Sequence, residues 1–248
     1  MSLRFRLFLE IGSGQSLQLS AEQLHYLKHV RRVRPGDLGE IITADQIFEL
    51  RVLSIEGSLL TYESIKVTPK SVQIIPKVLL YQSMPKQDKF SDILRSCTEL
   101  GLDSVVPVGS KRSVPTAPNE HKMIRWQRVL ESASEQCQRL DVPYLYDYIS
   151  FKEIAAHIQL FAPNTLKLMA WEEPDQKRVT LKSVLSKIPK PDQIMIFIGP
   201  EGGIDAQEAK ILQRLGFHTV SLGETILRVE HAAFSMLSNI LYEYSQGS

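Results

Sequence analysis

One segment sets the expected architecture: Ile194-Met195-Ile196-Phe197-Ile198-Gly199-Pro200-Glu201-Gly202-Gly203, an apolar run that leads into a glycine loop. An apolar run without alternation is typical of a strand covered on both faces, as in the centre of a parallel sheet. Asp205 and Glu208 follow at the spacing of an N-cap and its capping-box partner, which predicts a helix there. Strand, glycine loop and helix in this order put the loop at the carboxyl end of a central strand, where α/β sheets bind ligands.

The glycine loop differs from both common phosphate-binding loops. It lacks the Gly-Lys-Ser/Thr ending of a Walker A loop and the Gly-x-Gly-x-x-Gly spacing of a dinucleotide fingerprint. Its charged residue is the acid Glu201, which disfavours a phosphate but tolerates an adenine, a ribose or a sulfonium cation. The pattern indicates a ligand loop, with a plain turn without a ligand as the alternative.

Outward from this loop, apolar strands alternate with amphipathic helical stretches. This alternation is typical of a parallel sheet with helices on both faces, so we expect an α/β fold. The expected strands are Val78–Tyr81, Ser104–Val108, Leu166–Ala170, Gln193–Ile198 and Thr219–Leu222. The expected helices cover residues 88–100, 121–138, 180–187, 205–215 and 229–245.

The N-terminal part has a different, β-rich pattern. Three segments have the composition and partial alternation of strands: Leu38–Thr43, Ile47–Ser54 and Leu59–Lys66. Before them, Ser20 and Gln23 form a capping-box pattern that predicts a helix, ended by Pro35-Gly36. Its buried stripe would consist of Leu24, Leu27 and Val30. The prolines at 69 and 76 place the expected domain boundary between Thr68 and Pro76.

Bulk composition sets only broad limits. The chain has 248 residues and a formal net charge of +1, which leaves room for a local basic patch. Its two cysteines, Cys97 and Cys137, suit a reducing compartment and form no metal-type pair. No stretch approaches the ~20 apolar residues of a membrane span, and the N-terminal apolar run is too short for a signal peptide. We therefore expect a cytoplasmic protein without a membrane contact or a metal.

A second glycine turn follows the last expected strand. Leu222-Gly223-Glu224-Thr225-Ile226-Leu227-Arg228 leads into a helix whose first turn carries Arg228, Glu230 and His231. The helix dipole favours the anion Glu230 there, whereas Arg228 is less natural at a helix start and so points to an anionic partner. A surface salt bridge would explain Arg228 equally well.

The ordered motifs of the chain resemble those of the RsmE family. The strongest match joins Ile198–Gly203 to Leu222-Gly223-x-x-Ile226-Leu227-Arg228-x-Glu230. Weaker matches precede it in the family's order: His25–Asp37, Lys86, Lys89, Phe90, Glu99–Gly101, Trp126–Arg128 and Glu135–Pro143. The likeness covers nearly the whole chain. Each piece alone is modest, but their order and spacing together are specific.

Members of that family are SPOUT-class enzymes that methylate N3 of a uridine in small-subunit (16S) ribosomal RNA. The resemblance therefore implies S-adenosyl-L-methionine as the cofactor, ribosomal RNA as the substrate, and a homodimer. The resemblance also implies a fold, with a PUA-like RNA-binding β-barrel at residues 1–72. It further implies a SPOUT methyltransferase domain at residues 73–248 with a trefoil knot, an exception to the rule that chains avoid knots.

The resemblance also suggests which residues form the site. Arg228 and Glu230 are the candidates for catalysis: Arg228 would stabilise the anion that forms when uridine N3 loses its proton, and Glu230 would accept that proton or orient Arg228. The residues expected to hold the cofactor are Ala170, Trp171, Glu172, Ile198, Gly199, Pro200, Glu201, Gly202, Gly203, Leu222, Gly223, Ile226, Leu227 and Arg228.

A basic run near the N-terminus is the candidate RNA contact. Lys28, His29, Arg31, Arg32 and Arg34 lie close together with no acid between them. By itself such a run is as often a solvated helix face, but beside a methyltransferase domain phosphate binding is the better interpretation. Its core is Lys28, Arg31, Arg32 and Arg34, and the residues that would extend it are Arg4, Arg6, Lys86, Lys89, Lys111 and Arg112.

Three segments, with five residues between them, depart from the family's usual pattern. The family usually has Gly at the position of Gln138, Pro-Arg at Glu224-Thr225, and Thr at the positions of Val229 and His231. The two missing threonine hydroxyls leave substrate details open, although Arg228 and Glu230 are retained. Two alternatives stay open: a SPOUT methyltransferase that acts on another RNA site, such as a ribose 2′-OH, and a catalytically inactive RNA-binding or ribosome-assembly protein.

Overall fold

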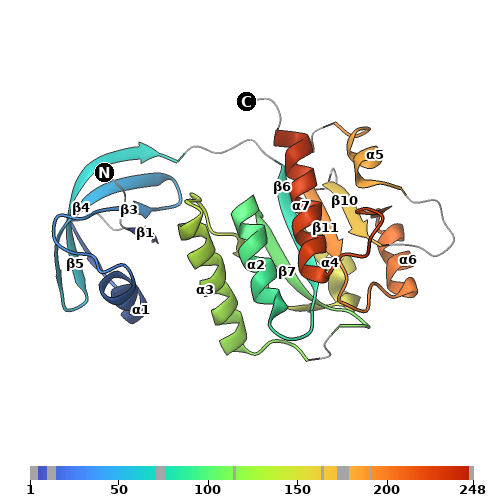
Figure 1. The fold of residues 1–248 in the computed structure, drawn as a ribbon, viewed down its shortest axis with the longest axis horizontal. Coiled ribbons are helices and arrows are strands. Elements are labelled where there is room, and N and C mark those ends of the chain that lie inside the picture. Colours follow the sequence, from blue (N-terminus) through green and yellow to red (C-terminus); the bar gives the residue numbers. More distant parts are fainter. Residues whose placement is uncertain are drawn as a thin grey trace. The chain divides into compact units, whose positions relative to one another are not determined.

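The computed structural model describes residues 5–9, 15–70, 76–113, 116–162, 165–171, 179–189 and 191–245. Contacts divide the chain into two compact units, both drawn in Figure 1. Unit 1 comprises residues 1–73 together with residues 135–141, and unit 2 comprises residues 74–134 and 142–248. Among the described residues, no helix has the length and apolar character needed to cross a membrane.

Unit 1 is built on a five-stranded sheet with the strand order β1-β3-β4-β5-β2. The three predicted strands are confirmed as β3 (Leu38–Ile42), β4 (Gln46–Glu56) and β5 (Leu59–Pro69). Two short strands were not predicted, namely β1 (Phe5–Phe8) and β2 (Ser16–Gln18). β3, β4 and β5 form an antiparallel meander, while β1 runs parallel to β3.

The predicted N-terminal helix is confirmed at its start but not along its length. α1 (Ala21–His25) begins with a complete capping box between Ser20 and Gln23, and it then widens into the π-helical turn η1 (Tyr26–Val30). Leu27 is fully buried, but Val30 is 60% exposed, so its assignment to the buried stripe is wrong. The wider π turn rotates later side chains off an α-helical stripe, which is the physical reason for the error.

Unit 2 contains a seven-stranded sheet whose main order is β12-β10-β11-β6-β7-β8. Every recorded strand pair in it is parallel, which confirms the predicted α/β fold with a parallel sheet. The five predicted strands are β6 (Lys77–Ser83), β7 (Ser104–Gly109), β10 (Thr165–Ala170), β11 (Gln193–Ile198) and β12 (His218–Val220). The short β8 (Tyr144–Leu145) and β9 (Ile149–Ser150) were not predicted.

Helices cover both faces of this sheet. The predicted helices are α2 (Lys89–Leu100), α3 (Glu120–Gln136), α5 (Leu181–Leu185), α6 (Ala206–Arg214) and α7 (Val229–Ser245). The short α4 (Ile154–Ile158) was missed. One buried cluster joins α2, α3, α5 and α7 to one face of the sheet, and a second cluster joins α4 and α6 to the other.

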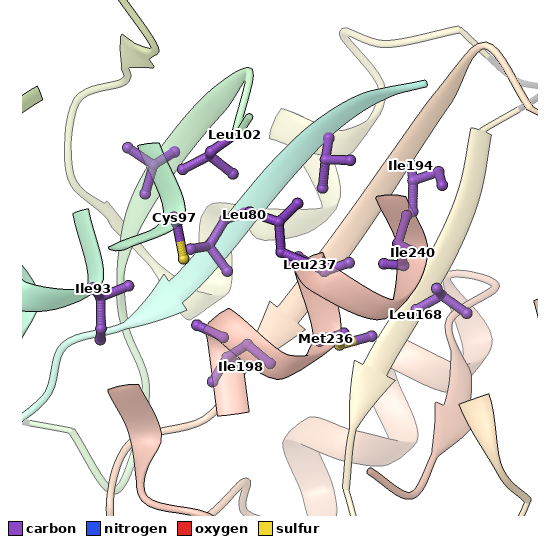
Figure 2. Close-up of a cluster of buried hydrophobic side chains, with 14 of the residues drawn as sticks. Leu80, Ile93, Cys97, Leu102, Leu168, Ile194, Ile198, Met236, Leu237 and Ile240 are labelled. Atoms are coloured by element: carbon purple, nitrogen blue, oxygen red, sulfur yellow. The ribbon is translucent and has the colours of Figure 1, made fainter. Parts of the chain in front are cut away.

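The apolar side chains of the central strand β11 pack on both faces of the sheet. Ile194, Ile196 and Ile198 belong to the first buried cluster, whereas Met195 and Phe197 belong to the second. Side chains alternate between the faces of a strand, so both sets must be apolar. Figure 2 shows Ile194 and Ile198 packed with Leu80 of β6 and Leu237 of α7 in the first cluster. Each such buried side chain contributes about 1.5–3 kcal/mol relative to exposure.

Strand order and register place the loops that follow three of these strands together. β11 lies between β10 and β6, and Ile198 is the register partner of both Ala170 and Gln82. Ala170 is in turn paired with Val220 of β12. The three strands β10, β11 and β12 therefore end at one level, so the segments that follow them meet at the carboxyl edge of the sheet.

Candidate functional site

A pocket of about 510 Å³ lies at this carboxyl edge. Its walls come from the ends of β10, β11 and β12, from the two glycine turns, and from the start of α7. The lining residues are Lys89, Arg112, Ala170, Trp171, Ile198, Gly199, Pro200, Glu201, Gly203, Ile204, Val220, Ser221, Leu222, Thr225, Ile226, Leu227, Arg228, Val229 and Ala232. The loops Gly199–Gly203 and Leu222–Arg228, which are far apart in the sequence, thus face one cavity. Ligand sites of α/β sheets are typically found at this edge.

Most of the residues predicted for the cofactor loops line this pocket. They are Ala170, Trp171, Ile198, Gly199, Pro200, Glu201, Gly203, Leu222, Ile226, Leu227 and Arg228. Gly202 and Gly223 are not among the lining residues, and Glu172 lies outside the described residues. The predicted segment from Leu222 to Glu230 also contributes Thr225 and Val229 to the lining. Sequence reasoning missed Ile204, Val220, Ser221 and Ala232, and it placed Lys89 and Arg112 on the RNA surface instead.

The first glycine turn has a shape that side chains would obstruct. A Cβ atom on Gly199 would stand 2.8 Å from Cγ1 of Ile204 and 3.0 Å from its backbone nitrogen. Gly203 has a φ of +70°, in the left-handed region that favours glycine, and its N–H donates to the Pro200 carbonyl at 2.8 Å. The turn from Gly199 to Gly203 is therefore tightly folded and has no side chain at its two ends.

Glu201 fastens this turn to the start of α2. Both of its carboxylate oxygens accept the backbone N–H of Lys86 at 3.1 Å, and Oε1 lies 3.2 Å from the ammonium of Lys89. Partial burial raises the pKa of Glu201. The N–H groups of Glu201 and Lys86 and the Lys89 ammonium outweigh this effect, so the pKa is lowered overall. Glu201 is thus an ionised anchor of the loop.

The other side of the turn is held by the segment after β7. Arg112 donates to the carbonyl of Gly202 at 2.9 Å, and the ammonium of Lys111 lies 3.1 Å from Asp205. Asp205 is the N-cap of α6, as predicted, and accepts the N–H of Gln207 at 3.0 Å. The carboxylate of Glu208, the expected capping-box partner, accepts the backbone N–H of Lys111 at 2.8 Å.

Arg228 and Glu230 differ in their surroundings. Arg228 is exposed and lines the pocket. Glu230 lies within the first turn of α7, and its Oε2 is 3.6 Å from the ammonium of Lys89. This oxygen is buried and has no hydrogen-bond partner among the described residues. A buried carboxylate oxygen without a hydrogen bond is costly, and a catalytic role is one explanation for keeping it.

The predicted RNA-binding residues divide into exposed and internally paired ones. Lys28, Arg31, Arg32, Arg34 and Lys86 are exposed. Arg6 is not: its side chain is 11% exposed, forms an ion pair with Glu40 and donates to the Arg139 carbonyl at 3.0 Å. Arg6 thus has an internal structural partner, which corrects its assignment to the RNA surface. Arg4 lies outside the described residues.

One departure from the family's pattern has a visible backbone consequence. Gln138 has a φ of +61°, in the region that favours glycine, and this is the position at which the family usually has Gly. The left-handed conformation follows from the local turn, since the Gln138 N–H points back to the Glu135 carbonyl at 3.3 Å. The chain therefore keeps a glycine-type backbone while carrying a side chain.

The fold and the pocket together define an α/β protein with a ligand site at the carboxyl edge of a parallel sheet. The chain belongs to the family of proteins with an RNA methyltransferase domain, since residues 73–241 match the model of that family. Within the part of the chain that the structure describes, no group of three or more His, Cys, Asp or Glu side chains could hold a metal ion.

Known relatives confirm the predicted resemblance to the RsmE family. The chain is 29% identical to the ribosomal RNA small subunit methyltransferase E of Bacillus subtilis, over 96% of each protein. It is 25% identical to the crystal structure of the methyltransferase E from Neisseria gonorrhoeae bound to S-adenosyl methionine, with a TM-score of 0.83 over 97% of this chain and 98% of that one. A methyltransferase from Legionella pneumophila shares the fold, with 24% identity, a TM-score of 0.84 and coverage of 98% of both chains.

Proposed function

We propose that this protein transfers a methyl group from S-adenosyl-L-methionine to N3 of a specific uridine in small-subunit ribosomal RNA. The observation that carries the proposal is the convergence of Gly199–Gly203, Leu222–Arg228 and the end of β10 on one pocket. The names of the relatives supply the substrate class, because they are ribosomal RNA small subunit methyltransferases.

The pocket suits this cofactor in size and chemistry. Its volume of about 510 Å³ falls within the range of roughly 300–1,000 Å³ typical of small-molecule sites. Ile198, Leu222 and Leu227 offer apolar contacts for an adenine, and the bare backbone of Gly203, where an added Cβ would meet no atom within 4 Å, allows close approach of a ligand. Trp171, half-buried at the pocket wall, is placed to cover a flat ligand group.

When bound, S-adenosyl-L-methionine supplies an electrophilic methyl group on a sulfonium. The residues of the chain must then hold the uridine and manage its N3 proton, because protonated N3 is a poor nucleophile. Arg228, at the pocket wall, is assigned to stabilise the negative charge that develops on the base. Glu230 is assigned to accept the proton or to orient Arg228, and its buried oxygen without a hydrogen-bond partner supports this role.

The remaining parts of the proposal concern domains and partners. Residues 1–72 would form a PUA-like RNA-binding barrel, supported by the five-stranded sheet and by exposed Lys28, Arg31, Arg32 and Arg34. Residues 73–248 would form the SPOUT domain with its trefoil knot. A second copy of the chain would cover the outer face of α7, where Phe234 is 42% and Tyr242 is 68% exposed. Such an enzyme would work in the cytoplasm, beside the ribosome.

Mass spectrometry of ribosomal RNA decides between this proposal and its alternatives. RNA from cells that lack the gene is compared with RNA from cells that carry it, and a base-resolved map locates any lost modification. Loss of one N3-methyluridine in small-subunit RNA is the expected result. Loss of a ribose 2′-O-methyl group would instead favour another RNA site, and an unchanged map would favour an inactive RNA-binding protein.

A further inference from the structure

Lys89 connects the two loops that enclose the pocket. It is the first residue of α2, and its ammonium lies 3.2 Å from Oε1 of Glu201 and 3.6 Å from Oε2 of Glu230. Glu201 belongs to the first glycine turn and Glu230 to the start of α7, which follows the second. The Lys89 side chain is 29% exposed and lines the pocket. A cation held by two carboxylates is poorly available for an RNA phosphate, which was its predicted partner.

The helix that carries Lys89 is firmly held. Asp88 forms an ion pair with Arg125 of α3 and accepts the Ser91 hydroxyl at 3.0 Å. Phe90 is buried, and the centroid of its ring lies 4.2 Å from the ring centroid of Trp126. The residues on both sides of Lys89 thus contact α3, and the ammonium reaches the two carboxylates from this anchored helix start.

The two carboxylates depend on this ammonium to different degrees. Glu201 also accepts the Lys86 N–H, whereas Lys89 is the cation recorded beside Glu230, whose Oε2 has no hydrogen bond among the described residues. Removal of the ammonium would leave two partly buried carboxylates that now share one cation without that cation. Like charges that share a site repel, and an unpaired buried charge is strongly unfavourable.

We propose that Lys89 is a positioning residue that ties the first glycine turn to the start of α7 and so holds these two walls of the cofactor pocket in place before any ligand binds. The identity of the cofactor rests on the proposed function, but the tie between the loops does not. Lys89 acts through Glu201 and Glu230 and takes no part in the methyl transfer itself. This role accounts for a lysine at the pocket wall better than phosphate binding does.

Hydrogen exchange of the ligand-free protein tests the tie directly. The variants are Lys89→Met, Lys89→Arg and the isosteric Glu201→Gln, with Arg95→Met as a matched control that removes an exposed cation from the same helix. Exchange of residues 199–204 is expected to rise about tenfold in Lys89→Met and in Glu201→Gln, and to stay at the wild-type rate in Arg95→Met. Lys89→Arg should restore most of the protection, because a guanidinium also pairs with both carboxylates.

The double variant Lys89→Met/Glu201→Gln keeps the test informative if one single variant loses stability. The effects of two substitutions that break the same contact do not add. The double variant should therefore exchange less than about twofold faster than either single variant. Calorimetry should show about tenfold weaker binding of S-adenosyl-L-methionine by Lys89→Met, with the KM for the cofactor raised and the KM for RNA unchanged.

Three results would overturn the proposal: wild-type exchange in Lys89→Met, additive effects in the double variant, or a selective loss of RNA affinity with normal cofactor binding, which would restore Lys89 to the RNA surface. If the wild-type protein bound no S-adenosyl-L-methionine, the proposed function would fail. The exchange data on the ligand-free protein would still decide the role of Lys89.

Discussion

Gly199 and Ile204 approach each other so closely that a methyl group does not fit between them. The added Cβ would lie 2.8 Å from Cγ1 of Ile204, which is 3% exposed and packed in the second buried cluster of unit 2. The contact joins the first residue after β11 to the residue that precedes the N-cap of α6. It therefore fixes how the chain turns away from the sheet beside the pocket.

Gly199→Ala should consequently destabilise the protein and disturb the pocket. Overpacking of this kind costs about 1–3 kcal/mol, measurable by urea denaturation, and cofactor affinity should fall with it. Adding Ile204→Ala to this variant removes Cγ1 but not the backbone nitrogen at 3.0 Å, so it should recover only part of the affinity. Wild-type affinity in Gly199→Ala would show that the turn has room that the structure does not show.

The roles assigned to Arg228 and Glu230 predict losses in turnover. Arg228→Ala should lower kcat about 100- to 1,000-fold, as for removal of a group that stabilises a developing anion. Glu230→Gln should lower kcat about 100-fold or more if Glu230 takes the proton. Steady-state kinetics with ribosomal RNA measures both, with the exposed Glu243→Gln on the same helix as the control. Full activity of both variants would remove these assignments.

The exposed basic run predicts a salt-dependent RNA affinity. Arg31→Glu combined with Arg32→Glu should weaken RNA binding and flatten its dependence on salt, because fewer counterions are released. Filter binding at several salt concentrations measures this, and Lys187→Glu, on an exposed site outside the proposed surface, controls for net charge. Unchanged affinity in the double variant would count against an RNA contact at this run.

The ion pair of Glu201 predicts how its contribution to stability depends on pH. The folded protein lowers the pKa of Glu201 below its ordinary value of 4.5, so the ionised form is the stabilised one. Its contribution is therefore complete above pH 4.5 and is lost as the pH falls through the lowered pKa. Glu201→Gln should be less stable than wild type at pH 7 by at most about 1 kcal/mol, since solvent screens such pairs.

Thermal denaturation at a series of pH values checks this prediction. The difference between wild type and Glu201→Gln should shrink steadily as the pH is lowered below 4.5, where the wild-type carboxyl also becomes neutral. A difference that stayed constant with pH would mean that the side chain stabilises the loop by its shape rather than by its charge.

The left-handed backbone at Gln138 predicts a stabilising substitution. Gln138 has a φ of +61°, in the left-handed region where a Cβ costs about 1 kcal/mol. Gln138→Gly removes this Cβ and should raise the free energy of unfolding by about that amount. Ser132→Gly, at an exposed position inside α3, should instead lower it by about 0.5–1 kcal/mol. Equal melting temperatures for wild type and Gln138→Gly would show that this backbone carries no strain.

The sequence by itself determined the elements with strong local signals and the order in which they occur. The apolar run at Gln193–Ile198, the capping box at Ser20 and the N-cap at Asp205 are each encoded within a few residues, and the structure confirms all three. Both glycine turns could also be found, because left-handed or crowded backbone selects glycine locally. Short strands such as β1, β8 and β9 give too few residues for a periodic signal, and they were missed.

Only the tertiary structure decided which charges meet. The residues next to Lys89 in the sequence do not indicate that it pairs with Glu201. The same holds for the pairing of Arg6 with Glu40 and of Arg112 with the Gly202 carbonyl. Ion pairs and hydrogen bonds are set by positions in space, which depend on strand order and register rather than on local sequence. The parallel register of β10, β11 and β12 brings distant loops to one edge of the sheet, and this makes the pocket.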